Sequence, residues 1–185
     1  MKTGYLISAL IIALSLLLAD RPVVAAGAGT TLGHTNALRC FQESRFVLSI
    51  EGIHFCDDAI DKDGLTRRDL AATYSNRGII NAGNGRYKRA LKDHTKAISI
   101  TPTLGQIYVN RGNVYFHTHE YEKALADYDI ALDVGGSLVH STYFNRGLAL
   151  LKMKRIEDAV TSLHAALAIT PNSKKIKRAL SSIEP

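Results

Sequence analysis

The pentapeptide Tyr-x-Asn-Arg-Gly occurs three times in this chain, and its spacing constrains the fold more than any other feature. The copies begin at Tyr74, Tyr108 and Tyr143, at intervals of 34 and 35 residues. A period between about 20 and 50 residues is typical of architectures that stack one small unit on the next. The sequence therefore predicts a repeat fold, whose units can be aligned on the glycine of the motif.

The aligned units, counted from Ala71, Gly105 and His140, share small residues at fixed positions. Positions 4, 8 and 11 lie on one face of a helix, and positions 17, 20, 24 and 27 lie on one face of a second helix. Pro102 and Pro171 follow the second helix and end it, because proline cannot continue the hydrogen-bond pattern. Each unit is therefore expected to form two antiparallel helices with an apolar face that only a neighbouring unit can bury. The small residues are glycine at position 8 and alanine at positions 20 and 27, namely Gly78, Gly112, Gly147, Ala90, Ala124, Ala159, Ala97, Ala131 and Ala166.

This pattern resembles the tetratricopeptide repeat family, whose units carry an aromatic residue at position 4, glycine at 8, alanine at 20 and 27, an aromatic at 24 and proline at 32. The resemblance covers residues 71–171. It implies an all-α fold, a right-handed superhelical solenoid of antiparallel helix hairpins. The units implied are 71–104, 105–138 and 140–173. Residues 174–184 have one apolar and one basic face, so we expect a helix that caps the open end.

A fourth, degenerate unit is expected at residues 33–66, where the register places the two cysteines of the chain. Cys40 falls at position 8 and Cys56 at position 24, on the facing sides of the two helices. We therefore predict a disulfide that closes a 16-residue loop and contributes about 3 kcal/mol. The alternatives are two free thiols or a metal site, and two cysteines without paired histidines make a poor zinc site.

The resemblance also implies a binding groove. In that family position 6 faces the concave side, where an asparagine can pair with a peptide backbone through both its donor and its acceptor. An extended peptide of about five residues is the ligand that three such units can hold, with two phenylalanines as anchors. A structural role, in which the asparagines bond the neighbouring helix or cap a turn, is the alternative. The implied groove residues are Asn76, Asn110, Asn145, Asn113, Phe116, His117, Phe144 and Lys152. Only Asn110 matches the set with which some relatives clamp a terminal carboxylate, so that clamp is disfavoured.

Arginine occupies position 7, which is usually apolar in the family and faces the helix pair. A buried arginine needs a carboxylate, because burying a lone charge is costly. Position 23 of the second helix lies at nearly the same height, so we predict the structural ion pairs Arg77–Asp93 and Arg111–Asp127. A place in the groove is the alternative for these arginines. The third unit has serine at position 23, so Arg146 must reach the preceding unit or solvent.

The N-terminus predicts export. Residues 1–26 combine an early lysine, an apolar run of 15 residues from Tyr5 to Ala19, and small residues before a cleavage point after Ala26 or Ala28. The run is shorter than the roughly 20 residues that span a bilayer, which disfavours the alternative of an uncleaved anchor. The chain has no Asn-x-Ser/Thr site, which favours a bacterial periplasm over a eukaryotic secretory route.

The remaining patterns favour a binding protein over an enzyme. The chain lacks the nucleophile-elbow, phosphate-loop and His-Glu-x-x-His motifs, so we expect no catalysis, no cofactor and no metal. The net charge of +6 comes mostly from scattered residues, and we predict no nucleic-acid partner. The expected function is a scaffold that holds an unknown peptide or protein in its groove. The alternative is contact between the basic C-terminal helix and anionic lipid or cell-wall polymer.

Overall fold

The structure is a computed structural model that describes residues 35–136 and 138–183, and the regular structure in these ranges is entirely helical. The expected leader, residues 1–26, lies outside the described residues. No described helix is both long enough and apolar enough to cross a bilayer. The helical elements are α2 (Asn36–Gln42), the π-helical η1 (Glu43–Val47), the 3₁₀-helical η2 (Ile50–Gly52), α3 (Ile53–Lys62), α4 (Arg67–Gly83), α5 (Tyr87–Ile100), α6 (Gly105–His117), α7 (Tyr121–Val134), α8 (Val139–Lys152), α9 (Ile156–Ile169) and α10 (Lys174–Ser181).

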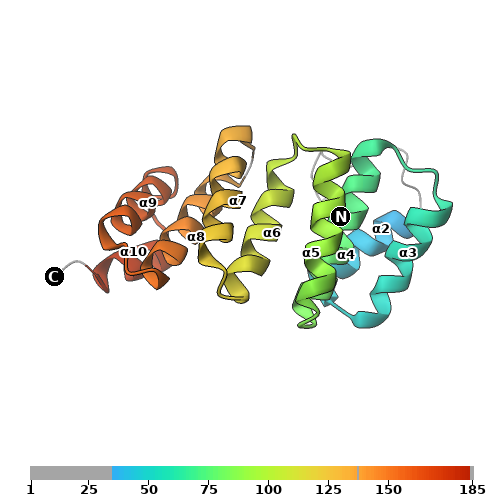
Figure 1. Cartoon of the computed structure of the whole chain (residues 1–185), viewed down its shortest axis with the longest axis horizontal. Coiled ribbons are helices and arrows are strands. Elements are labelled where there is room, and N and C mark those ends of the chain that lie inside the picture. The colour runs from blue at the N-terminus through green and yellow to red at the C-terminus, as the bar shows by residue number, and fades with distance from the viewer. Residues whose placement is uncertain (1–34, 137, 184–185) are drawn as a thin grey trace, which may run out of the picture. The chain divides into compact units, whose positions relative to one another are not determined.

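These helices form hairpins that stack in chain order (Figure 1). Helices α4 and α5, α6 and α7, and α8 and α9 make the three hairpins of the repeated motif, and each packs against the next. The pair α2 and α3 packs on α4 at one end, and α10 packs on α9 at the other. The predicted all-α solenoid of helix hairpins is confirmed.

Each hairpin closes where glycine at position 8 meets the residue at position 24. A Cβ atom added to Gly78 would lie 2.7 Å from the ring of His94, and one on Gly112 would lie 2.7 Å from the ring of Tyr128. In the third hairpin, the same atom on Gly147 would lie 2.9 Å from Leu163. Even a methyl group is too large at these points, so glycine sets the distance between the two helices of a hairpin.

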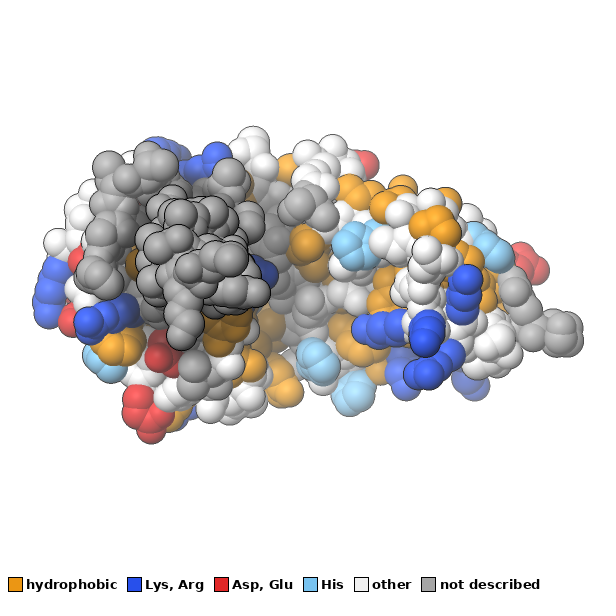
Figure 2. All heavy atoms as spheres, turned by 180° about the vertical axis from the view of Figure 1, so that it is seen from behind, with side chains coloured by type: hydrophobic (Ala, Val, Ile, Leu, Met, Phe, Trp, Pro, Cys, Tyr) orange, Lys and Arg blue, Asp and Glu red, His pale blue; other side chains and the backbone are white. Residues whose placement is uncertain are grey.

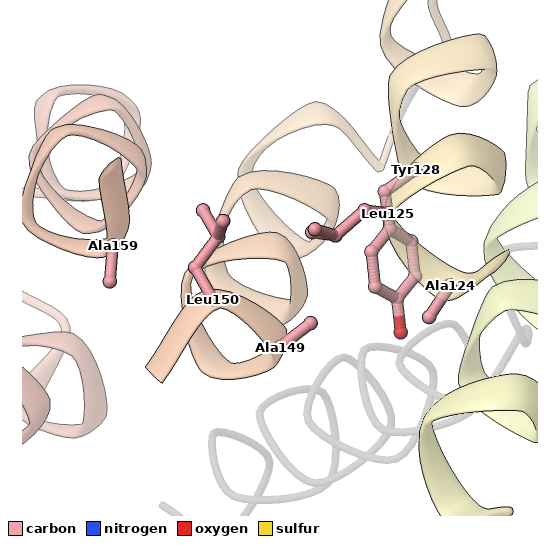
Figure 3. Packing of buried hydrophobic residues seen from close by; sticks show 6 residues of the cluster. All are labelled: Ala124, Leu125, Tyr128, Ala149, Leu150 and Ala159. Atoms are coloured by element: carbon pink, nitrogen blue, oxygen red, sulfur yellow. The ribbon is translucent and has the colours of Figure 1, made fainter. Parts of the chain in front are cut away.

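Neighbouring hairpins share a core between the second helix of one and both helices of the next. Figure 3 shows one such cluster, in which Tyr128 and its neighbours on α7 face residues of α8, with Ala159 of α9 on the far side of Leu150. Alanines at the repeated positions are almost fully buried there, which lets the helix backbones approach. The cluster consists of Ala124, Leu125, Tyr128, Ala149, Leu150 and Ala159.

The turn between the two helices of each hairpin has the same backbone conformation. Gly85, His119 and Lys154 occupy equivalent positions and have φ values of +71°, +63° and +61°. Only the first is a glycine, the residue that adopts this left-handed conformation without strain. The short turn is therefore conserved in geometry between units although its residue changes.

The N-terminal hairpin departs from the regular unit. Its first helix, α2, continues into the π-helical η1 and ends at Leu48 in a left-handed conformation. Its second helix, α3, begins only after Gly52, at Ile53. Cys40 and Cys56 form a disulfide with Cα atoms 4.8 Å apart. The covalent bond thus occupies the place where glycine meets a large side chain in the other hairpins.

Helix α10 covers the last hairpin. The hydroxyl of Ser173 accepts a hydrogen bond from the backbone amide of Ile176, which caps its N-terminus. Ile176 and Leu180 are buried against α8 and α9, in one cluster with Phe144 and Leu163. This helix takes the position that the first helix of a further hairpin would otherwise take.

Candidate functional site

The first helices α4, α6 and α8 form the inner wall of the stack. Successive first helices contact each other directly, and they approach more closely than the second helices α5, α7 and α9 do. Elements on the inside of a curve lie closer together than those on the outside. The side chains that these helices turn away from their hairpins therefore define the candidate binding surface.

The asparagines of the repeated motif join neighbouring helices along this wall. Asn110 donates from Nδ2 to the hydroxyl of Ser75 on α4 at 3.1 Å, and Asn145 donates from Nδ2 to Oδ1 of Asn113 on α6 at 2.9 Å. Asn76 is half-buried on α4 and bonds no other described side chain. The structural role left open by the sequence thus applies to the amide nitrogens of Asn110 and Asn145.

Two further predicted groove residues are half-buried on the wall. Asn113 is half-buried, and its Oδ1 also accepts a hydrogen bond from the hydroxyl of Tyr128 at 2.9 Å. Phe116 is half-buried, and its ring meets that of Tyr121 edge to face with centroids 5.5 Å apart. Both residues support the hairpin and leave only part of their surface to a ligand.

One edge of the wall, at the C-terminal ends of α6 and α8, is open. His117 is exposed at the end of α6, and its ring stacks on that of Tyr87 with centroids 6.4 Å apart. Lys152 is exposed at the end of α8. These two side chains are the groove residues that a ligand reaches without displacing any contact of the core.

Phe144 is not a groove anchor, and this prediction was wrong. Its side chain is only 6% exposed and belongs to the cluster beneath α10. The ammonium group of Lys175 on α10 lies 4.3 Å from the centre of its ring. No further hairpin packs on the hairpin of α8 and α9 in the described residues. Helix α10 packs there and buries Phe144.

The arginines at position 7 join their own hairpin to the preceding one. Arg77 pairs with Asp93 in its own hairpin at 2.7 Å and with Asp57 of α3 at 2.5 Å. Arg111 pairs with Asp127 at 2.7 Å and donates to the hydroxyl of Thr95 on α5 at 3.2 Å. Both predicted ion pairs are present. Hydrogen bonding to Asp127 raises the pKa of Arg111 above its ordinary value, against the opposing effect of burial.

In the third hairpin and in the N-terminal hairpin, the arginine at position 7 has different partners. Arg146 donates to the hydroxyl of Ser162 in its own hairpin and pairs with Asp129 of the preceding one at 2.7 Å. In the N-terminal hairpin, the guanidinium of Arg39 lies 5.2 Å from the centre of the ring of Phe55. The second partner of each arginine, at position 25 of the preceding unit, was not predicted from the sequence. A search for a polar residue two places after position 23 would have found Asp57, Thr95 and Asp129.

Hydrogen-bonded polar side chains connect the hairpin of α4 and α5 with the hairpin of α6 and α7. The hydroxyl of Ser75 lies 3.3 Å from Nδ1 of His94, and both residues are almost fully buried. Burial, reinforced by the positive charge of Arg111, lowers the pKa of His94 to about 3. Because no substrate can reach this serine and histidine, the pair is a packing contact. The described residues also contain no cluster of His, Cys, Asp and Glu that could hold a metal ion.

Comparison with known families gives one match. The model of the tetratricopeptide repeat matches residues 140–173, which span nearly all of α8 and all of α9 and end just before α10. The third hairpin is therefore similar in sequence to a tetratricopeptide repeat. No curated protein matches the chain.

Solved structures show that the tetratricopeptide fold extends over the other hairpins. The first tetratricopeptide domain of Spaghetti (RPAP3) bound to the HSP90 peptide SRMEEVD is 23% identical, with a TM-score of 0.59, over 61% of this chain and 89% of that one. The N-terminal domain of stress-induced protein-1 from C. elegans is 20% identical, with a TM-score of 0.60, over 66% of this chain and all of that one. MamA of MSR-1 is 18% identical, with a TM-score of 0.63, over 80% of this chain and 82% of that one.

Proposed function

We propose that this protein is a non-enzymatic binding module that holds an extended peptide, or an extended segment of a partner protein, along the wall formed by α4, α6 and α8. The observation that carries this proposal is the wall itself, on which half-buried asparagine amides lie beside the half-buried Phe116, and exposed His117 and Lys152 lie at one edge. A similar structure holds the HSP90 peptide SRMEEVD. Amide donors and acceptors bind the main chain of an extended peptide, while apolar contacts select its side chains.

The test uses a library of random decapeptides displayed on phage, and peptides selected on the parent protein are then measured by titration calorimetry. His117→Ala combined with Lys152→Ala should weaken their binding at least about tenfold, because both side chains are exposed at the edge of the wall. The double variant also loses the stacking of His117 on Tyr87, so its melting curve is recorded beside the titration. The matched control is Lys96→Ala, which removes an exposed lysine of α5 on the other side of the hairpin. Equal affinities of the double variant and the control would contradict the proposal.

The asparagines need a separate measurement, because they also support the helices. Asn145→Ala removes the hydrogen bond to Asn113, so its melting temperature must be measured beside its affinity for the selected peptides. A variant that loses peptide affinity at a temperature where it remains folded would place this amide in contact with the ligand. A variant that loses only stability would restrict Asn145 to the structural role.

We also propose that the protein works outside the cytoplasm, in the cell envelope. The leader pattern of residues 1–26 supports this, and so does the disulfide, because such bonds persist in oxidising compartments. N-terminal sequencing of protein from the envelope fraction should begin at Gly27 or at Gly29. An N-terminus at Met1 in cytosolic protein would contradict it.

A second candidate surface is the outer side of α10. Lys174, Lys177 and Arg178 are exposed there, and Figure 2 shows Lys and Arg side chains gathered near the C-terminal end. Anionic lipid or cell-wall polymer is the partner that this charge favours. Deleting the helix would uncover the core around Phe144, so the test replaces these three residues with glutamine. Binding to phosphatidylglycerol vesicles that is lost in the variant and weakened by salt would support this surface.

A further inference from the structure

The second helices α5 and α7 turn the same positions of the unit to the outside of the stack. They belong to successive hairpins, with α6 between them in the chain (Figure 1). Positions 18, 19, 22, 25, 26 and 29 are exposed in both helices, and we call these residues the outer face of each helix. The outer face of α5 consists of Lys88, Arg89, Lys92, Thr95, Lys96 and Ser99, and that of α7 of Glu122, Lys123, Ala126, Asp129, Ile130 and Asp133.

The outer face of α5 carries only positive charge. Its four cations form no ion pair with any described carboxylate. The single carboxylate of the helix, Asp93, is 5% exposed and pairs with Arg77. Lys88, Lys92 and Lys96 recur every fourth residue, so they follow one line of about 12 Å along the helix. Cations that look scattered in the sequence are therefore gathered on one helix face.

The outer face of α7 is negative. Glu122 and Asp133 form no ion pair with a described cation, and Asp129 pairs with Arg146. The one cation of this face, Lys123, pairs with Glu120 of its own turn. Beside the carboxylates, Ile130 is an apolar side chain with 39% of its surface exposed. This helix face thus offers unpaired negative charge next to an apolar contact.

The two outer faces are complementary, but a single chain cannot bring them together, because both point to the outside of its own stack. A second copy can. A twofold axis that runs along the helices, between α5 and α7, places α5 of each copy against α7 of the other. Equivalent positions then lie at nearly the same height, which sets Lys88 opposite Glu122. The aliphatic parts of Lys92 and Lys96 come close to Ile130 and can cover it.

Helix α3 is a poorer acidic partner for α5. Two of its carboxylates, Asp57 and Asp58, already form ion pairs with Arg77 and Lys62 of their own chain. An exposed charge that is already paired gains less from a new partner than an unpaired one does. The unpaired carboxylates of α7 therefore favour the contact between α5 and α7.

We propose that two copies of this protein form a dimer through these outer faces. The contact uses six positions on each of two helices, about half of the roughly 20–30 residues on each side of a standard interface. A dimer of this size should be weak, with a dissociation constant in the micromolar range. The walls of α4, α6 and α8 stay open in both copies, so the dimer would present two binding surfaces. Dimerisation does not require that a peptide binds there, and each proposal can fail without the other.

The first test is sedimentation velocity of the purified protein over a range of micromolar concentrations, at low salt and at about 0.5 M NaCl. The protein should dimerise at low salt. The dissociation constant should rise at least about tenfold at high salt, because the screening length then falls below about 5 Å and most contacts join exposed charges.

The decisive test reverses the charge of each face separately. The acidic variant combines Lys88→Glu, Lys92→Glu and Lys96→Glu, and the basic variant combines Glu122→Lys and Asp133→Lys. Each variant alone should be monomeric, because like charges then face each other. An equimolar mixture of the two should dimerise as the parent does, because opposite charges meet again at both contacts. Melting curves check that each variant is folded.

The matched control reverses three exposed cations of α10, with Lys174→Glu, Lys177→Glu and Arg178→Glu. It changes the net charge as much as the acidic variant does, and it should dimerise like the parent. The proposal is overturned if the parent stays monomeric at low salt, if the acidic variant dimerises like the parent, or if the mixture stays monomeric. A monomeric parent that binds heparin more tightly than the acidic variant does would assign the outer face of α5 to a polyanion instead.

Discussion

The arginines at position 7 show how a single residue can join two hairpins. Each one uses one side of its guanidinium group on its own second helix and the other on the preceding hairpin. The planar group has five N–H donors in a fixed arrangement, which suits this double contact better than the single ammonium of lysine does. The repeated Asn-Arg-Gly motif therefore encodes contacts between units as well as packing within them.

Asp127→Ala should lower the free energy of unfolding by about 2 kcal/mol, well above the roughly 0.5 kcal/mol of an ordinary surface substitution. The carboxylate is only 4% exposed, and its removal leaves the guanidinium of Arg111 without its charged partner. Urea denaturation measures the loss. Asp158→Ala is the control, because its pair with Arg155 is half-exposed and contributes little. Equal losses in the two variants would refute a structural role for the buried pair.

The buried His94 should make stability depend on pH. Its pKa is about 3 in the folded protein, against an ordinary value of 6.5. Between these values the unfolded chain binds a proton that the folded protein excludes, so the free energy of unfolding falls as the pH is lowered from 6.5 towards 3. The histidine accounts for about 2 kcal/mol of the loss between pH 8 and pH 5.

His94→Leu should remove this part of the pH dependence, because leucine fills the same position in the third hairpin at Leu163. The measurement is the melting temperature of the parent and the variant at several pH values between 5 and 8. Parallel curves for the parent and His94→Leu would show that His94 does not carry the effect.

At the scale of the element, the ends of the stack differ from its middle. The internal hairpins have neighbours on both sides, whereas the N-terminal hairpin of α2 and α3 has a disulfide and the last hairpin has α10. A terminal unit cannot bury its outer face against another unit, so it needs a cap or a covalent bond. The disulfide and the capping helix each replace contacts that ordinary side-chain packing makes in an internal hairpin.

Ile176→Ala should destabilise the protein by about 2–4 kcal/mol, because it removes the most deeply buried side chain of α10 and leaves a cavity above Phe144. Lys177→Ala changes the exposed face of the same helix and should cost less than about 0.5 kcal/mol. Chemical denaturation of both variants gives the comparison. If the two costs were alike, α10 would not contribute to the core.

At the scale of the whole molecule, stability in a stacked repeat is a sum of local terms, because each hairpin contacts only its neighbours. A change in one hairpin should therefore have effects that decline along the chain. The contacts of the described residues follow this rule, since each hairpin packs on the one before it and the one after it.

Replacing both Cys40 and Cys56 with alanine tests this locality. The lost disulfide should cost about 3 kcal/mol, and the loss should appear as faster amide hydrogen exchange in α2 and α3. Exchange in α7, α8 and α9 should stay at the rate of the parent. An equal acceleration in every helix would instead mean that the solenoid unfolds as one cooperative unit.

The sequence by itself determined the contacts that recur inside every unit. The glycines at position 8, the alanines of the second helices and the pairs Arg77–Asp93 and Arg111–Asp127 could be assigned from the period, because helical geometry fixes which positions of a hairpin face each other. The disulfide between Cys40 and Cys56 could be predicted from the same register. The half-exposed asparagines could be assigned to the first helices but not to a role, because a side chain on that face can bond a neighbour or a ligand.

Only the tertiary structure decided the contacts between units and at the ends. The burial of Phe144 and the second partner of each arginine depend on which helix lies alongside. A repeat period fixes the positions within one hairpin, but the surroundings of each hairpin are set by its neighbour. Where that neighbour is a capping helix, or where it differs in sequence from the other hairpins, the same position acquires a different environment.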